Sequence, residues 1–369
     1  MEHEFTSKIK AILKNHFSYL SEIIFEKSYL IQYINLKTRS AEKGSKSRSS
    51  FANLYAIFVV LEDYVNKGYV ERQDYQNYEG ALYSNLLSRQ RKLPFGEKLQ
   101  NHSLNSRLNS EFQKYFQMID YVPILRNLET SRYWINENLI LINLETRSVN
   151  IAKAVLEIIL EYSKTKQNAF ELFVKNCEEL QKIDKQNSKK IKNFIIELLS
   201  PKSDARLFEI VSFSILKYHY INYKIYWGYD LNTINEDNLK LYKTGRTNAN
   251  DGGIDFVMKP LGRFFQVTET LDFKKYFLDI DKIQKYPITF VIKSNDSIEN
   301  IKHQIKQNAL KLYPVKDILD RYLECIEEVI NIPILIDFFI NAIEKNLINN
   351  ILDEIINQSK LEFNYNFES

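Results

Sequence analysis

The residue types best suited to chemistry in this chain are a carboxylate and a polar pair on two short predicted strands. Asp255 lies in an apolar, β-favouring run, and Gln266 and Thr268 lie two residues apart in the next such run. The turn residues at 260–262 (Pro-Leu-Gly) predict a tight connection between the two runs. Because side chains alternate along a strand, Gln266 and Thr268 should share one face of it. A carboxylate beside a carbonyl oxygen is a set of hard oxygen donors of the kind that Mg²⁺ accepts.

The opposite face of the second strand is predicted to carry Phe265, Val267 and Glu269. Glu269 is therefore an alternative ligand only where a bulge reverses the alternation. Simpler interpretations also stand. Asp255 follows two glycines and suits a turn, and Gln, Thr and Glu are ordinary residues for the polar end of a strand.

A second carboxylate lies in a predicted helix over residues 205–218. Glu209 is surrounded there by apolar residues, which leave little polar surface on the helix. A buried carboxylate costs several kcal/mol unless a cation or a metal compensates it. Glu209 is thus expected to point at a metal site, to form an ion pair with Arg206 or Lys217, or simply to be exposed.

The rest of the sequence predicts the elements that would position these groups. Residues 1–200 are mainly helical, with clear helical spacing over 6–37 and 51–65, a strand-like run at 139–144 and a helix from 148. Ser200-Pro201 marks a domain boundary, because proline disfavours helix in the residue before it. Beyond it we expect strands at 223–229, 264–270 and 288–292 and a helix at 273–285. The chain is expected to be helical from 297 to the end.

These residues resemble the PD-(D/E)XK nuclease superfamily, the fold of most type II restriction endonucleases. Asp251-Gly252-Gly253-Ile254-Asp255 followed by Gln266-Val267-Thr268 is similar to the Gln-x-Lys variant of Mrr-like restriction enzymes. The resemblance covers roughly residues 204–295. It implies an α/β fold whose core is a mixed β-sheet flanked by helices, at 201–310, between a helical N-terminal region and a helical segment at 311–369.

The resemblance also implies roles for the residues. Glu209 takes the place of the helix carboxylate, Asp255 that of the central metal ligand, and Gln266 that of the family's glutamate, all three binding Mg²⁺. Thr268 stands where the family has lysine, so a catalytic lysine would have to come from elsewhere, at Lys293 or Lys259. The implied activity is sequence-specific hydrolysis of double-stranded DNA. A homodimer and a cognate DNA methyltransferase are the implied partners.

Two basic segments of residues 1–200 are candidates for DNA contact. Residues 89–107 contain the arginine and amide side chains that read base edges, and the loop at 43–48 could neutralise phosphates. Both are equally compatible with an ordinary solvated surface. The candidates are Lys46, Arg48, Arg89, Arg91, Lys92, Asn101 and Arg107.

Composition sets broad limits. A net charge of +3 and a pI near 8.4 are compatible with DNA binding without requiring it. The two cysteines lie far apart in the sequence, which excludes a disulfide framework and a zinc motif built from them. No segment has the composition of a signal peptide or a membrane span, so we expect a cytoplasmic protein.

Three alternatives remain at this point. The absence of the family's lysine favours a non-cleaving DNA-binding relative. A helical interaction protein, in which the Asp-Gly-Gly-Ile-Asp run is only a turn, is the second. A nuclease that acts on RNA or on repair intermediates is the third.

Overall fold

The structure is a computed structural model that describes residues 2–39, 47–97, 99–144, 147–182, 188–201, 203–244, 254–269, 273–312 and 315–363. It consists of two compact units, Met1–Phe173 (unit 1) and Val174–Ser369 (unit 2). The long helix α9, Ala152–Gln181, contributes residues to both units. The boundaries predicted after residues 200 and 310 both lie inside unit 2.

Unit 1 is mainly helical, as its apolar spacing predicts. Its first part folds as α1 (Glu4–Phe17), α2 (Ser21–Lys27), α3 (Tyr29–Thr38) and α4 (Ser47–Asn66), with the 3-10 turn η1 (Ser18–Leu20). Apolar side chains from these helices and from α9 form one buried core. Leu54, Tyr55 and Ile57 of α4 have no exposed surface, so α4 is the central helix of this core.

Shorter elements complete unit 1. They are α5 (Tyr69–Arg72), η4 (Tyr75–Asn77), β1 (Ala81–Leu82), α6 (Tyr83–Lys92), η5 (Ser103–Arg107), α7 (Leu108–Tyr115), β2 (Ile124–Asn127), β3 (Arg132–Ile135), α8 (Glu137–Ile140), β4 (Leu141–Asn143) and β5 (Ser148–Asn150). Two sequence predictions are confirmed here over shorter ranges. The run at 139–144 begins as the end of helix α8 and becomes strand β4 at Leu141. The helix predicted from about 148 begins at Ala152, because residues 148–150 pair with β4.

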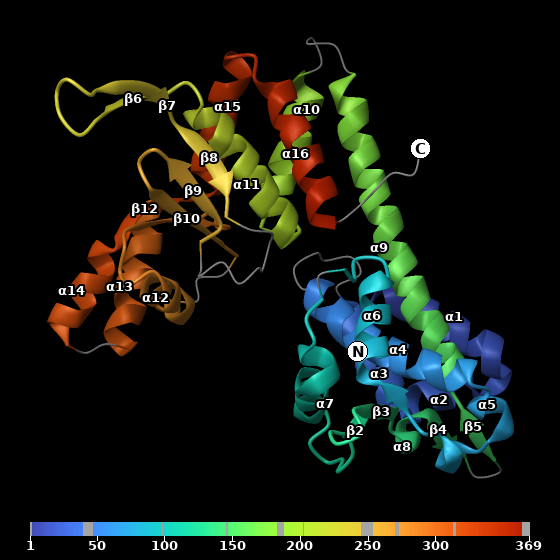
Figure 1. The fold of residues 1–369 in the computed structure, drawn as a ribbon. Coiled ribbons are helices and arrows are strands. Elements are labelled where there is room, and N and C mark those ends of the chain that lie inside the picture. Colours follow the sequence, from blue (N-terminus) through green and yellow to red (C-terminus); the bar gives the residue numbers. More distant parts are fainter. Residues whose placement is uncertain are drawn as a thin grey trace. The chain divides into compact units, whose positions relative to one another are not determined.

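The centre of unit 2 is a five-stranded mixed sheet (Figure 1). Its strands are β8 (Lys240–Lys243), β9 (Phe256–Lys259), β10 (Arg263–Thr268), β11 (Ile288–Ile292) and β12 (Ile326–Ile330), in the order β12-β11-β10-β9-β8. β8, β9 and β10 are antiparallel neighbours, whereas β10, β11 and β12 run parallel. The prediction that residues beyond 297 are wholly helical is therefore wrong, because β12 is an edge strand of the sheet.

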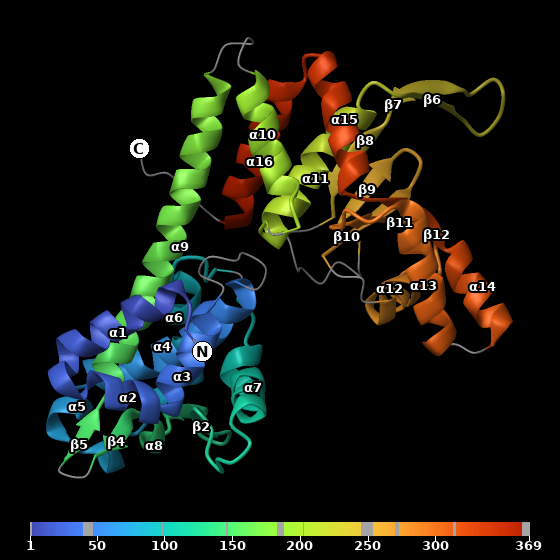
Figure 2. The same ribbon diagram turned by 180° about the vertical axis from the view of Figure 1, so that it is seen from behind.

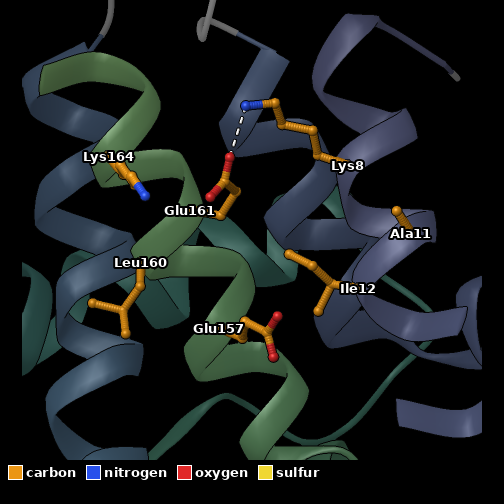
Figure 3. A pocket seen from close by; sticks show the side chains of 7 residues that line it. All are labelled: Lys8, Ala11, Ile12, Glu157, Leu160, Glu161 and Lys164. Carbon is orange, nitrogen blue, oxygen red and sulfur yellow. Dashed lines mark hydrogen bonds and ion pairs between the residues drawn. The ribbon is translucent and has the colours of Figure 1, made fainter. Parts of the chain in front are cut away.

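One face of the sheet is covered by α12 (Phe273–Lys282), α13 (Ile298–Leu312) and α14 (Lys316–Glu324) (Figure 2). Tyr276 of α12 stacks on Phe290 of β11 with ring centroids 4.7 Å apart. Phe277 of α12 meets Tyr322 of α14 edge-on at 5.0 Å. These contacts belong to one apolar core between the three helices and the sheet.

The other face is covered by α11, Ala205–Tyr220. Asp204 caps this helix by accepting hydrogen bonds from the backbone N–H groups of Arg206 and Leu207. The ring centroids of Phe213 of α11 and Phe256 of β9 are 5.2 Å apart, so α11 packs on the face of the sheet that carries Phe256. The two faces of the sheet therefore meet different helices.

Behind α11 lie α10 (Ser188–Leu199), α15 (Ile332–Glu344) and α16 (Ile348–Phe363). The helical segment predicted at 311–369, for which the sequence leaves packing or dimerisation open, thus contributes two helices that pack on α11, and Leu335 of α15 is fully buried. A separate hairpin is formed by β6 (Lys224–Trp227) and β7 (Asn235–Asn238). β6 confirms the predicted strand at 223–229 over a shorter range.

Unit 2 is thus a mixed α/β structure of helices around a sheet. Within the described residues, no helix combines the length and apolar character that crossing a bilayer requires.

Candidate active site

Asp255, directly before β9, lies beside Gln266 of β10, at the end of this strand pair away from its connecting turn. The backbone N–H of Asp255 donates to the carbonyl of Phe265 at 2.9 Å, and Asp255 Oδ2 accepts from the backbone N–H of Val267 at 2.7 Å. Asp255 therefore bonds to the residues on both sides of Gln266. The carbonyl of Asp255 accepts from the backbone N–H of Thr244, beyond β8, while its N–H is directed at β10, so the ladder is irregular at Asp255 and its carboxylate lies beside the backbone of Gln266.

The Gln266 side chain has a buried oxygen with no hydrogen-bond partner. The residue is 6% exposed, and its Nε2 donates to the carbonyl of Val267 at 3.2 Å, whereas Oε1 is unpaired. Exchanging the two amide atoms would place two acceptors against each other, so this bond fixes the orientation of the amide. A buried unpaired carbonyl oxygen costs about 1–3 kcal/mol, which a bound cation or a hydrogen-bond donor would remove.

The predicted alternation along β10 is confirmed. Gln266 pairs in register with Phe290 of β11, whose ring stacks on α12, so the Gln266 side of β10 faces α12. Thr268, two residues on, shares that face and is 2% exposed. Phe265 faces the other way, toward Tyr220 of α11 at 6.4 Å.

Glu209 lies on the α11 face, and so it is on the other side of the sheet from Gln266 and Thr268. Its Oε1 is 2.9 Å from Nζ of Lys243 at the end of β8, and both side chains are at least 90% buried. The ion pair expected for Glu209 is therefore present, but its partner is Lys243, not Arg206 or Lys217. Arg206 instead lies 4.0 Å from Glu362, and Lys217 pairs with Glu354 at 2.7 Å.

Lys293 lies directly after β11 and is also on the α11 face. Its ammonium bonds to Glu269 Oε1 at 2.9 Å and to the backbone carbonyl of Ser203, and it lies 5.6 Å from the ring centre of Phe208. The Lys293 side chain is only 2% exposed. The backbone nevertheless links it to the strand with Thr268, because the Lys293 N–H donates to the Thr268 carbonyl at 2.9 Å. Lys259 is exposed at the far end of β9 from Asp255.

The sequence-predicted residues thus separate into two sets. Gln266 and Thr268 share the α12 face, with Asp255 bonded to the backbone beside Gln266, while Glu209 and Lys293 lie on the α11 face. Lys243 and Glu269 complete the second set as their partners. The sequence gives no signal for the role of Lys243 beyond its charge. The alternation along β10, by contrast, does predict that Glu269 and Gln266 lie on different faces of the strand.

Asp255 and the neighbouring Gln266 side chain together suit a magnesium ion. Among the described residues there is no group of three or more His, Cys, Asp and Glu side chains arranged to hold a metal. One carboxylate and one amide oxygen nevertheless suffice for Mg²⁺, which usually retains several waters and binds substrate phosphates as well. The unpaired Gln266 oxygen is the observation that fits such an ion.

The candidate DNA-contacting residues that the structure describes lie in unit 1. Arg89 of α6 forms a two-pronged ion pair with Glu62, with both N–O distances 2.7 Å. Arg91 bonds to the carbonyl of Leu99 at 3.4 Å. Three further candidates, Lys92, Asn101 and Arg107, are exposed or half-buried. Lys46 and the side chain of Arg48 lie outside the described residues.

Comparisons with protein-family models, with curated proteins and with solved structures found no match to this chain.

Proposed function

We propose that this chain is a magnesium-dependent, sequence-specific endodeoxyribonuclease of the type II restriction class. The observation that carries the proposal is the Asp255–Gln266 pair, in which a carboxylate lies beside a buried and unpaired amide oxygen. The order of elements supports it. Helix α11 precedes the Asp255 strand, and the antiparallel strand with Gln266 and Thr268 follows, as the resemblance to PD-(D/E)XK nucleases implies.

The chemistry assigned to the site follows from its donors. Magnesium held by Asp255 and Gln266 would supply charge stabilisation at the phosphate and a more acidic water. Asp255 is held in place because the Val267 N–H fixes one of its oxygens. Thr268, whose side chain faces the same way as Gln266, would orient a water through its hydroxyl group.

The positive charge that the family obtains from lysine on this strand is assigned to Lys293. Its backbone is bonded to that of Thr268, although its ammonium is held by Glu269 on the other face. Glu269 is 30% exposed and can turn toward solvent, but the ammonium would also have to leave the carbonyl of Ser203 to reach the Gln266 side of the sheet. Glu209 could take part only if its ion pair with Lys243 were broken first, since Lys243 neutralises it in this structure.

The proposed substrate is double-stranded DNA that is unmethylated at the recognition site. A palindromic site is best matched by a two-fold homodimer. A DNA methyltransferase that acts on the same site would protect the host, and both proteins would work in the cytoplasm.

The test is cleavage of unmethylated phage DNA with Mg²⁺ or with EDTA. It compares the wild type with Asp255→Asn, which keeps a hydrogen-bond acceptor for Val267 but removes the charge. Asp317→Asn, at an exposed position of α14, is the matched control. Discrete magnesium-dependent fragments that disappear only in Asp255→Asn would support the proposal. Equal cleavage by Asp255→Asn would contradict the assigned site.

A second candidate function has its own supporting observation. Thr268 occupies the position of the family's lysine, and Glu209 is engaged by Lys243 away from Gln266. Both features are compatible with a DNA-binding relative that does not cleave. Intact phage DNA together with salt-sensitive binding of the same DNA would favour this function. A folded protein with neither property would favour a helical interaction protein, and cleavage of RNA alone would place the site in a different nuclease.

A further inference from the structure

Asp279, in the second turn of α12, is a buried carboxylate that is only half satisfied. The residue is 1% exposed. Its Oδ1 accepts from Nζ of Lys282 at 2.8 Å, whereas its Oδ2 is buried without a hydrogen-bond partner. A carboxylate oxygen left unpaired in the interior is costly, so a cation or a donor is expected beside it.

The geometry of α12 shows which way Asp279 faces. Side chains on an α-helix advance by about 100° per residue. Tyr276 faces β11, because it stacks on Phe290. Phe277 and Asp281 lie on one flank of the helix, since both contact Tyr322 of α14.

Asp279 lies on the opposite flank. α14 packs beside β12 at one edge of the sheet, so the flank away from it is directed toward β10 and β9. This is the part of the sheet where Gln266 faces α12. Asp279 therefore lies on the same side of the sheet as the Gln266 side chain.

The two unpaired oxygens on this side of the sheet have the same chemical requirement. Gln266 Oε1 and Asp279 Oδ2 are both acceptors, and an acceptor cannot satisfy another acceptor. A divalent cation with its waters satisfies several oxygen acceptors at once. Asp255, whose carboxylate is fixed beside Gln266, adds a further oxygen ligand from the sheet.

We propose that Asp279 is a ligand of the divalent-cation site formed with Asp255 and Gln266, and that it supplies the second carboxylate that Glu209 does not. This inference rests on the magnesium site of the proposed function and adds a residue from α12 to it. The site then has two carboxylates and one amide oxygen, from the residue before β9, from β10 and from α12.

The test measures metal binding directly and does not depend on cleavage. Mn²⁺ is titrated into the full-length protein without DNA, and free Mn²⁺ is followed by electron paramagnetic resonance. The variants are Asp255→Asn, Asp279→Asn and the control Asp281→Asn, which changes the aspartate on the other flank of the same helix. Asp255→Asn and Asp279→Asn should each weaken Mn²⁺ binding at least about tenfold, because even residues that only support metal ligands contribute that much. Asp281→Asn should bind as the wild type does.

Thermal unfolding separates loss of a ligand from loss of the fold. Without metal, Asp279→Asn should unfold at or above the wild-type temperature, since it removes a buried charge. Mn²⁺ should raise the unfolding temperature of the wild type but not that of Asp279→Asn. Unchanged Mn²⁺ affinity in Asp279→Asn, alongside weakened affinity in Asp255→Asn, would overturn this inference and leave the proposed function intact. A wild type that binds Mn²⁺ through Asp279 but leaves every DNA uncut would support the metal site while contradicting the nuclease.

Discussion

The carboxylate of Glu209 is bonded to the ammonium of Lys243 at 2.9 Å, on the face of the sheet opposite Gln266. Both side chains are buried, so each ion depends on the other for compensation. This pair explains how a carboxylate is accommodated on an otherwise apolar helix. It also means that any role of Glu209 in metal binding requires Lys243 to be displaced first.

Removing Lys243 should therefore destabilise unit 2. Lys243→Met leaves Glu209 buried and unpaired, and breaking a buried pair in this way costs about 3–5 kcal/mol. Urea denaturation measures the loss. The double variant Glu209→Gln, Lys243→Met should recover most of it, because neither charge remains. Recovery of the single variant by Mg²⁺ alone would instead show that Glu209 can bind the metal.

Lys293→Met should cost less stability than Lys243→Met, on the order of 1–3 kcal/mol. The reason is that its partner Glu269 is 30% exposed and can be hydrated once the ammonium is gone, whereas Glu209 cannot. If Lys293 supplies the catalytic charge, this variant should also lose cleavage while its DNA affinity stays near that of the wild type. Cleavage assays below its unfolding temperature, with filter-binding measurements in parallel, check both points. Full cleavage would remove Lys293 from the mechanism.

Acid should weaken unit 2 through His219. Burial, together with the charge of Lys345, lowers the pKa of this histidine from 6.5 to about 4, and its ring stacks on Phe338 at 3.7 Å. Between pH 6.5 and 4 the unfolded chain therefore takes up a proton that the folded chain does not. The stabilisation is complete above the unfolded pKa and is lost as the pH falls through this window. The loss is on the order of 1–2 kcal/mol, since the ring is partly open to solvent.

His219→Phe, which preserves stacking, should flatten this dependence. Chemical denaturation at a series of pH values from neutral to acidic gives the free energy of unfolding for both proteins. Parallel curves for the two would show that the acid sensitivity arises at another group.

DNA binding should depend more on Lys92 than on Arg89. Lys92 is exposed at the end of α6, whereas Arg89 is neutralised by Glu62. Lys92→Gln should lower affinity and reduce the slope of log affinity against log salt by about one phosphate contact. The double variant Arg89→Gln, Glu62→Gln leaves the net charge unchanged and should alter neither quantity. Lys27→Gln, an exposed change on α2, controls for net charge, and an equal effect there would argue against a defined contact.

The sequence predicted the strands and helices around the candidate site well. The apolar runs at β10 and β11 and the helical spacing of α11 and α12 are strong periodic signals, and their order is observed. β7 was missed because Asn235–Asn238 is wholly polar, and β12 because its two glutamates interrupt the apolar pattern. Strand pairing with the rest of a sheet overrides such weak local preferences.

The arrangement of the side chains was less predictable. Helical periodicity shows that α11 is largely buried, but it does not show which face of the sheet the helix covers. That choice places Glu209 away from Gln266. No sequence pattern marks Lys243 as the partner of Glu209 either. Its role depends on the position of β8 at the edge of the sheet, which the sequence does not show. The alternation along β10 depends only on strand geometry and was therefore predicted correctly.

The two faces of β10 also determine where the chain can change in length. Gln266 and Thr268 face one layer of helices, while Phe265 and Val267 face the other, so a one-residue insertion or deletion within the strand would exchange the two sets. Polar groups would then enter the α11 side, and apolar groups would replace the candidate ligands. Length variation should consequently be excluded from 263–268. It should be tolerated at the exposed tip of the β6–β7 hairpin, where Tyr229 is 98% exposed and no buried register has to be kept.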